Sequence, residues 1–184
     1  MTGRITIVFI IICTLFHTSP LSAKKKEVIG WLEMVRVFPG NLKIRAKLDT
    51  GAKVSSLNAS NLEYLHINDK RWIRFKLYIR DKIATTIEKQ VLKTVSIKKR
   101  DGGVEERPVI KIGICIGNVF KEIEVNLVDR SNLNYQLLIG RNDSKSMYLI
   151  DPSLTFTKEP TCKPTPEYTD SKTKKNSEEN KNNH

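Results

Sequence analysis

Histidine and cysteine are scarce in this chain, with three of each among 184 residues. His17 lies near the start and His184 is the last residue, which leaves only His66 in the body of the chain. Serine and cysteine nucleophiles need a nearby base, most often histidine, and zinc sites need clustered histidine or cysteine ligands. A Gly-Lys-Ser/Thr loop that would hold nucleotide phosphates is also missing. The sequence therefore predicts no metal, no nucleotide cofactor and no nucleophilic serine or cysteine.

Long apolar runs are missing as well, apart from one near the N-terminus. Arg4 precedes an apolar run from Ile5 to Phe16, and Leu21-Ser22-Ala23 offers a small-residue cleavage site. The run is too short to cross a bilayer comfortably, so residues 1–23 are predicted to be a cleaved signal peptide. The protein would then be exported to the periplasm. An uncleaved N-terminal membrane anchor is the alternative.

Acidic residues are outnumbered: 20 Asp and Glu face 32 Lys and Arg, for a net charge of +12. Such a balance attracts acidic partners, among them an anionic envelope surface. The basic residues are nevertheless scattered and interleaved with glutamate. Only Trp72 and Tyr78 offer aromatic rings on which nucleic-acid bases could stack. We therefore expect a solvated surface and no nucleic-acid partner, with electrostatic contact to the envelope as the alternative.

Removal of the leader leaves two cysteines. Cys115 lies in an apolar strand pattern, whereas Cys162 lies in a polar segment. In an oxidising compartment the two thiols could pair. Their different surroundings favour two free thiols, one buried and one in the tail.

The remaining chain alternates apolar and polar residues over short stretches, which is typical of strands. Strands are expected at 28–38, 42–48, 72–80, 92–98, 109–116 and 148–152, with a return strand through Ile123, Val125 and Leu127. Residues 61–65 read as a single helical turn, and 83–90 are ambiguous. From Pro160 onward, prolines and polar residues replace the apolar ones. The predicted organisation is a signal peptide (1–23), one all-β domain (24–157) and a disordered polar tail (158–184).

The most informative stretch is Leu48-Asp49-Thr50-Gly51-Ala52, at the end of the strand 42–48. It places a carboxylate at a tight turn, next to a hydroxyl group and exposed backbone N–H groups. Two such carboxylates brought together share one proton, so one can act as general base on a water and the other as general acid. The same three residue types also suit an ordinary turn at a strand end.

A second motif, Leu137-Leu138-Ile139-Gly140-Arg141-Asn142, makes the pattern recognisable. Together with Asp-Thr-Gly-Ala it resembles the retropepsin-like aspartic peptidases, in which the second motif threads beside the active-site loop. The match is closest to a bacterial branch labelled "ATP-dependent zinc protease", and covers about residues 28–151. It rests on Gly30-Trp31-Leu32-Glu33, Ala46–Ala52, Ser55-Ser56-Leu57, Asp129-Arg130-Ser131 and Gly140-Arg141-Asn142. Because the sequence supports neither zinc nor ATP, we adopt neither half of that label.

The resemblance implies a closed retropepsin-like β-barrel with one Asp-Thr-Gly half-site per chain. Asp49 would be catalytic, and its loop would be supported by Thr50, Gly51, Ala52, Arg130, Ile139, Gly140 and Arg141. The hairpin tip at Asp101, Gly102 and Gly103 would be the flap that closes over substrate, although an ordinary hairpin loop would look the same. A dyad needs two carboxylates, so the mechanism requires a homodimer with its twofold axis between two copies of Asp49. Lys53 departs from the viral pattern. If it points at Asp49 it would lower the carboxyl pKa, and if it points outward nothing follows.

The predicted function is an exported aspartic endopeptidase that acts on proteins or peptides. The alternative is a catalytically silent domain of the same fold that binds envelope proteins or peptides by strand addition. A third hypothesis is a basic module that binds an anionic surface polymer.

Overall fold

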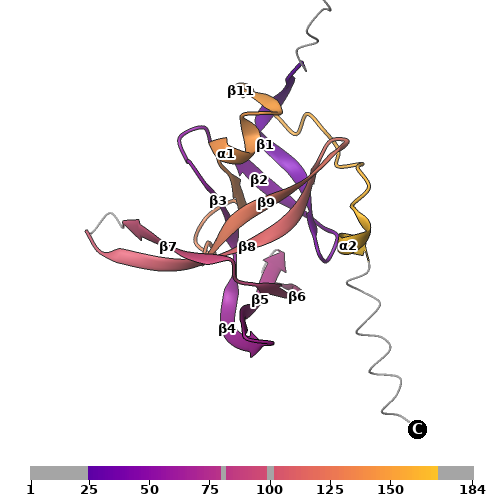
Figure 1. Cartoon of the computed structure of the whole chain (residues 1–184). Coiled ribbons are helices and arrows are strands. Elements are labelled where there is room, and N and C mark those ends of the chain that lie inside the picture. Colours follow the sequence, from indigo (N-terminus) through magenta and orange to yellow (C-terminus); the bar gives the residue numbers. More distant parts are fainter. Residues whose placement is uncertain (1–24, 80–81, 99–101, 170–184) are drawn as a thin grey trace, which may run out of the picture.

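The computed structural model describes residues 25–79, 82–98 and 102–169 as an almost entirely β structure (Figure 1). The leader, Asp101 and the chain beyond Thr169 lie outside the described residues. Within the described residues, no helix is long and apolar enough to cross a membrane. The strands are β1 (Glu27–Phe38), β2 (Leu42–Leu48), β3 (Ser55–Asn58), β4 (Ser60–Ile67), β5 (Lys70–Ile79), β6 (Lys82–Gln90), β7 (Lys93–Lys98), β8 (Val104–Ile116), β9 (Val119–Val128), β10 (Leu137–Ile139) and β11 (Tyr148–Thr155). Two one-turn helices, α1 (Arg141–Ser144) and α2 (Pro166–Thr169), complete it.

Eight strands form one sheet in the order β11-β1-β2-β10-β3-β9-β8-β7. An additional pairing between β1 and β8, in which Val37 lies opposite Ile114, closes this sheet into a six-stranded barrel. The expected closed all-β barrel is thus confirmed. Alternate residues of the barrel strands point inward and are fully buried, as Val35 and Val37 on β1 illustrate. Because that alternation is already visible in the sequence, most strands fall where it predicts them.

A second, three-stranded sheet of β4, β5 and β6 lies below the barrel in Figure 1. One face of β5 carries Ile73, Phe75 and Leu77, all fully buried in the main core. The helical turn expected at residues 61–65 is wrong, because these residues belong to strand β4. Asn68 and Asp69 both adopt positive φ angles and reverse the chain there, so that β4 pairs with β5 as a hairpin.

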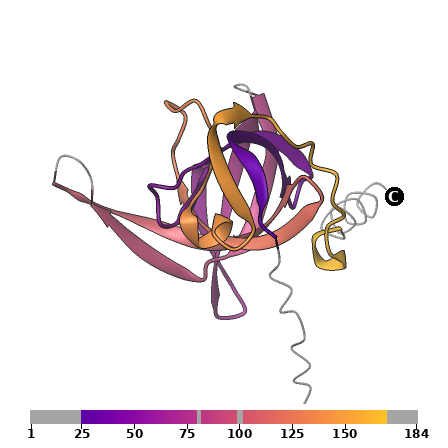
Figure 2. The ribbon, with the colours of Figure 1, turned by 90° about the horizontal axis from the view of Figure 1, so that it is seen from above.

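Strands β7 and β8 form the expected hairpin, with Lys98 opposite Val104 at its described end. Gly102 has a φ of +84° with open space around it, which suits a turn residue at a hairpin tip. Figures 1 and 2 both show the hairpin projecting from the barrel on the side opposite α2. Its role as a flap stays a prediction.

The C-terminal segment differs from expectation. β11 pairs in parallel with β1, and residues 158–169, expected in the disordered tail, continue across the barrel as far as the buried Tyr168. Thr161 and Cys162 donate their N–H groups to the carbonyl of Gly117, which brings Cys162 beside Cys115. The two cysteines form a disulfide bond, so the expectation of free thiols is wrong.

Glu33 of β1 explains how this segment is fixed. The side chain is fully buried. Oε1 accepts hydrogen bonds from Gly30 N–H (2.8 Å), Thr157 N–H (3.0 Å) and the Thr157 hydroxyl (2.6 Å), while Oε2 accepts one from Lys158 N–H (3.2 Å). One buried carboxylate therefore satisfies four donors on two segments that are far apart in sequence.

Replacing Glu33 with alanine should lower the free energy of unfolding by about 3 kcal/mol, because buried donors are left without acceptors. Glu33→Gln keeps one acceptor oxygen, so it should lower the free energy of unfolding by less. Urea unfolding measures the effect, with the exposed Glu106→Ala as control. A Glu33→Ala loss no larger than that of Glu106→Ala would contradict this role.

Candidate active site

Asp49 sits at the first residue after β2, where the chain leaves the barrel in a tight turn. Its own N–H donates to the carbonyl of Ile139 (2.9 Å), which fixes the backbone at the end of the strand. Within the turn, Gly51 N–H donates to Asp49 Oδ1 (2.9 Å) and Ala52 N–H donates to the Asp49 carbonyl (3.2 Å). The carboxylate is therefore oriented by the backbone that follows it.

Strand β10 threads beside this turn. It pairs in parallel with β2 and antiparallel with β3, so it lies between the two strands that flank the turn. Just beyond it, Arg141 N–H donates to the Ala52 carbonyl (2.9 Å), and the Arg141 guanidinium donates to the Thr50 carbonyl (2.6 Å). Ile139, Gly140 and Arg141 thus lie against the Asp49 loop, where the sequence places them.

Gly140 is required by the close approach of the two segments. A Cβ atom on Gly140 would lie 2.7 Å from the backbone carbon of Val54 and 2.8 Å from its carbonyl oxygen. Backbone atoms held by hydrogen bonds on both sides cannot move aside cheaply. Only glycine lets α1 begin at this position.

Ser55 joins the two segments from inside and was missed as a site residue by sequence reasoning. It is fully buried. Its hydroxyl donates to Asp143 Oδ2 (2.5 Å) and accepts from Gly140 N–H (3.0 Å). The Ser-Ser-Leu motif after the turn was a signal for this position, but Asp143 on α1 had none.

Arg130 lies on the loop after β9 and reaches the same region. Its N–H donates to Asn58 Oδ1 (2.7 Å), and its guanidinium donates to the Ser56 hydroxyl (3.0 Å) and to the Tyr135 carbonyl (3.1 Å). Burial and the nearby Arg107 lower the pKa of Arg130, while the negative charge of Asp49 acts in the opposite direction. Among the residues that the structure describes, no carboxylate forms an ion pair with Arg130.

The cation beside Asp49 is Lys47 of β2, two residues back in the chain. Its Nζ lies 3.1 Å from Asp49 Oδ2. Burial by itself raises the pKa of Asp49, but the hydrogen bonds from Lys47 and Gly51 and the charge of Lys47 outweigh it and lower the pKa below its usual value. Lys53 is exposed and forms no ion pair with Asp49. Of the two orientations that the sequence left open for Lys53, the structure shows the one that does not reach Asp49, and Lys47 was not considered.

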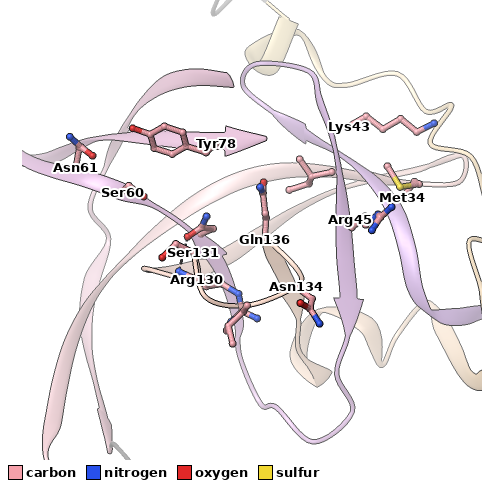
Figure 3. A pocket seen from close by; sticks show the side chains of 13 residues that line it. Met34, Lys43, Arg45, Ser60, Asn61, Tyr78, Arg130, Ser131, Asn134 and Gln136 are labelled. Atoms are coloured by element: carbon pink, nitrogen blue, oxygen red, sulfur yellow. Dashed lines mark hydrogen bonds between the residues drawn. The ribbon is translucent and has the colours of Figure 1, made fainter. Parts of the chain in front are cut away.

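A basic pocket of about 820 Å³ opens next to Arg130, between β2 and the β4–β5 hairpin. Figure 3 shows Arg130 and Gln136 in its middle, Asn61 and Tyr78 at one end, and Lys43 and Arg45 at the other. None of the 13 described residues that line it is acidic. Its lining comprises Met34, Lys43, Ile44, Arg45, Asn58, Ser60, Asn61, Tyr78, Arg130, Ser131, Leu133, Asn134 and Gln136.

A single Asp-Thr-Gly turn, supported by a threaded Gly-Arg segment in a closed barrel, defines a retropepsin-like half-site. The family model described as the retropepsin-like aspartic endopeptidase RimB matches residues 28–161. The chain therefore belongs to the RimB-like family.

Several relatives carry a different name. The chain is 34% identical over 136 residues to a protein of Shewanella halifaxensis named "probable alpha-L-glutamate ligase", and 29% identical over 134 residues to one of the same name from Desulfotalea psychrophila. These matches cover 71% and 70% of this chain but only 30% and 29% of the relatives. The chain thus spans less than a third of their length.

The crystal structure of a Legionella pneumophila protein, Lpg0085, is also similar to this chain. The TM-score is 0.64 at 31% sequence identity, with 73% of this chain and all of the other covered. That protein is described as having unknown function.

Replacing Lys47 with methionine should raise the pKa of the Asp49 carboxyl group, because the ion pair that favours the charged form is removed. An NMR titration of the Asp49 side-chain carbon measures this shift. Lys53→Met is the matched control and should leave the titration unchanged. A larger shift in Lys53→Met than in Lys47→Met would contradict the assignment.

Proposed function

We propose that this protein is an exported aspartic endopeptidase whose active site forms between two copies of the chain. The observation that carries the proposal is the single Asp49 carboxylate, held at a turn by Gly51 N–H and by Ile139 on β10. Membership of the retropepsin-like family supports a peptidase. Because each chain supplies one such turn, a twofold axis between two Asp49 loops completes the dyad.

In the dimer, the second carboxylate opposes the effect of Lys47. Two adjacent carboxylates cannot both ionise cheaply, so the pair retains one proton and one charge. The ionised Asp49 takes a proton from the attacking water, and the protonated one donates its proton to the leaving amine. Lys47 favours loss of the shared proton, which places the working range on the acidic side of neutrality.

Asp49→Asn should lower peptide cleavage by about 10²- to 10⁴-fold, since a proton-transfer group is removed. The mature chain, starting near Lys24, is tested on a mixed-peptide library across acidic to neutral pH. Sedimentation measures the oligomeric state of each variant. Asp69→Asn is the control, because it makes the same change at an exposed turn.

Two outcomes would decide against this function. Cleavage by a strictly monomeric protein would exclude the shared dyad. A folded dimer that binds peptides but cleaves none, at any pH, would favour the silent binding domain of the same fold.

We further propose that the substrate is an acidic peptide. The relatives named alpha-L-glutamate ligase contain a region similar to this chain, and this chain carries a net charge of +12. The residues of the basic pocket also favour an acidic substrate. Arg130 is half-buried there without a carboxylate partner among the described residues, and Lys43 and Arg45 contribute to the same lining. A glutamate side chain would supply the missing anion.

Arg130→Gln should lower kcat/KM for a glutamate-containing peptide by about tenfold or more, the loss expected for one hydrogen bond to a charged group. For the matched peptide with glutamine in place of glutamate, kcat/KM should fall much less. The ratio of the two rates separates recognition from damage to the fold, because a structural defect lowers both. Arg74→Gln, on the separate sheet, should leave the ratio unchanged, and an unchanged ratio in Arg130→Gln would contradict the subsite.

A further inference from the structure

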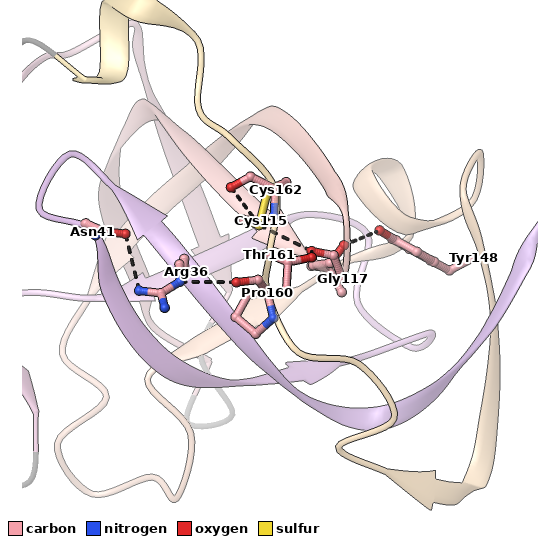
Figure 4. The surroundings of a disulfide bond; sticks show 9 residues. Arg36, Asn41, Cys115, Gly117, Tyr148, Pro160, Thr161 and Cys162 are labelled. Atoms are coloured by element: carbon pink, nitrogen blue, oxygen red, sulfur yellow. Dashed lines mark hydrogen bonds between the residues drawn. A yellow bond between two sulfur atoms is a disulfide. The ribbon is translucent and has the colours of Figure 1, made fainter.

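Residues 156–169, which follow β11, form a C-terminal strap across the outside of the barrel. Phe156 N–H donates to the Leu32 carbonyl (2.7 Å), and Glu33 holds the next two residues. Further along, the Arg36 guanidinium donates to the Pro160 carbonyl (3.2 Å), as Figure 4 shows. The Glu33 contacts give the strap a first anchor at β1 that is independent of its cysteine, and the Arg36–Pro160 hydrogen bond lies beyond this anchor.

The second anchor is the disulfide bond between Cys162 and Cys115 of β8, which are 47 residues apart in sequence. Cys115 is fully buried, whereas Cys162 is partly exposed. Tyr168 of the strap forms a small second core with Phe38 and Cys115, and Phe120 packs against it. The Tyr168 hydroxyl also donates to Glu122 (2.6 Å). The disulfide adds a covalent link to a part of the strap that is also held by this small apolar cluster, by hydrogen bonds and by the Lys89 ammonium group over the Tyr168 ring.

The strap also binds the charged ends of two residues of the basic pocket. Glu159 forms an ion pair with Lys43, at 2.5 Å. The Arg45 guanidinium lies over the ring of Phe156, 5.9 Å from its centroid. Lys43 and Arg45 thus line the pocket while their cationic groups are held by the strap. Glu159 is thus the carboxylate paired with Lys43, in an ion pair that is exposed to solvent.

We propose that the Cys115–Cys162 disulfide is a redox-sensitive latch that keeps Glu159 on Lys43 and so weakens the binding of acidic peptides in the basic pocket. This inference rests on the proposed acidic substrate. When the disulfide is reduced, the strap beyond Lys158 detaches while the Glu33 anchor remains. Lys43 then becomes free to turn toward a carboxylate in the pocket.

The redox step needs a dithiol reductant, such as a thiol oxidoreductase or dithiothreitol. Its thiolate attacks the accessible sulfur of Cys162, and Cys115 leaves as a thiolate that takes up a proton. The second thiol of the reductant then displaces Cys162 from the mixed disulfide. Two electrons pass to the protein, which ends with two thiols, and the reductant ends as a disulfide.

The test uses the mature Asp49→Asn chain, so that binding is measured without cleavage. The probe is a fluorescently labelled pentaglutamate peptide, and binding is followed by anisotropy with the disulfide oxidised or reduced by dithiothreitol. Hydrogen exchange of the Thr161 and Cys162 amides reports independently whether the strap is attached. We expect reduction to speed exchange at both amides and to tighten binding by up to about fivefold, the range for an exposed ion pair.

Glu159→Gln separates the ion pair from the latch. In the oxidised protein it should tighten peptide binding while the exchange of Thr161 and Cys162 stays slow. Glu167→Gln is the matched control, because it removes a negative charge from the strap at a residue outside the pocket, and it should leave the affinity unchanged. The Cys115→Ser/Cys162→Ser double variant should behave like the reduced protein.

Slow exchange at Thr161 and Cys162 after complete reduction would overturn the latch. Fast exchange with unchanged affinity would overturn the link between strap and pocket. A lack of proteolysis by the unsubstituted chain would count against the peptidase and leave these binding and exchange results standing, so the two failures are distinguishable.

Discussion

The geometry of the candidate site depends on the hydrogen bonds between the Asp49 loop and the segment that threads beside it. Asp49 N–H binds the Ile139 carbonyl, and the Ala52 and Lys53 carbonyls accept from Arg141 and Asn142. Backbone groups of a loop that leaves a barrel need partners, and here β10 and α1 supply them. Gly140 permits this contact by its lack of a side chain. The carboxylate is thus positioned by main-chain geometry, which varies little when surface residues change.

Barrel closure connects the strand that carries the Asp49 loop with distant parts of the chain. β1 pairs with β2, β8 and β11, so a single strand connects the Asp49 strand, the strand that leads from the hairpin, and the C-terminal segment. Glu33 on β1 then holds the start of the strap through its buried carboxylate. The strap, in turn, contacts Lys43 on β2 through Glu159. In the proposed latch, a redox change at Cys162 therefore acts on the basic pocket through the strap and its Glu159–Lys43 ion pair.

The features that sequence reasoning predicted correctly are those that depend on local patterns. Alternation located the core strands such as β1 and β2, and the turn residues located Asp49 and the hairpin near Gly102. The errors concern contacts between distant segments. The hairpin of β4 and β5 depends on Asn68 and Asp69, which were not read as its turn. The disulfide depends on the path of a polar segment that is ordered by contacts with the barrel, and composition does not encode that path.

The ion pair of Asp49 bears directly on the proposed dimeric mechanism. With Lys47 at 3.1 Å, the carboxylate of one chain has its pKa lowered and is ionised at neutral pH. General acid catalysis requires a protonated partner, and within this site a second Asp49 is the group whose negative charge would raise the pKa of the pair. In the proposed dimer, Lys47 and the second Asp49 would therefore have opposite effects on the pKa of the pair, and their balance would set the pH at which one proton is shared. In this arrangement the strength of one lysine–carboxylate contact links dimer formation, working pH and catalysis.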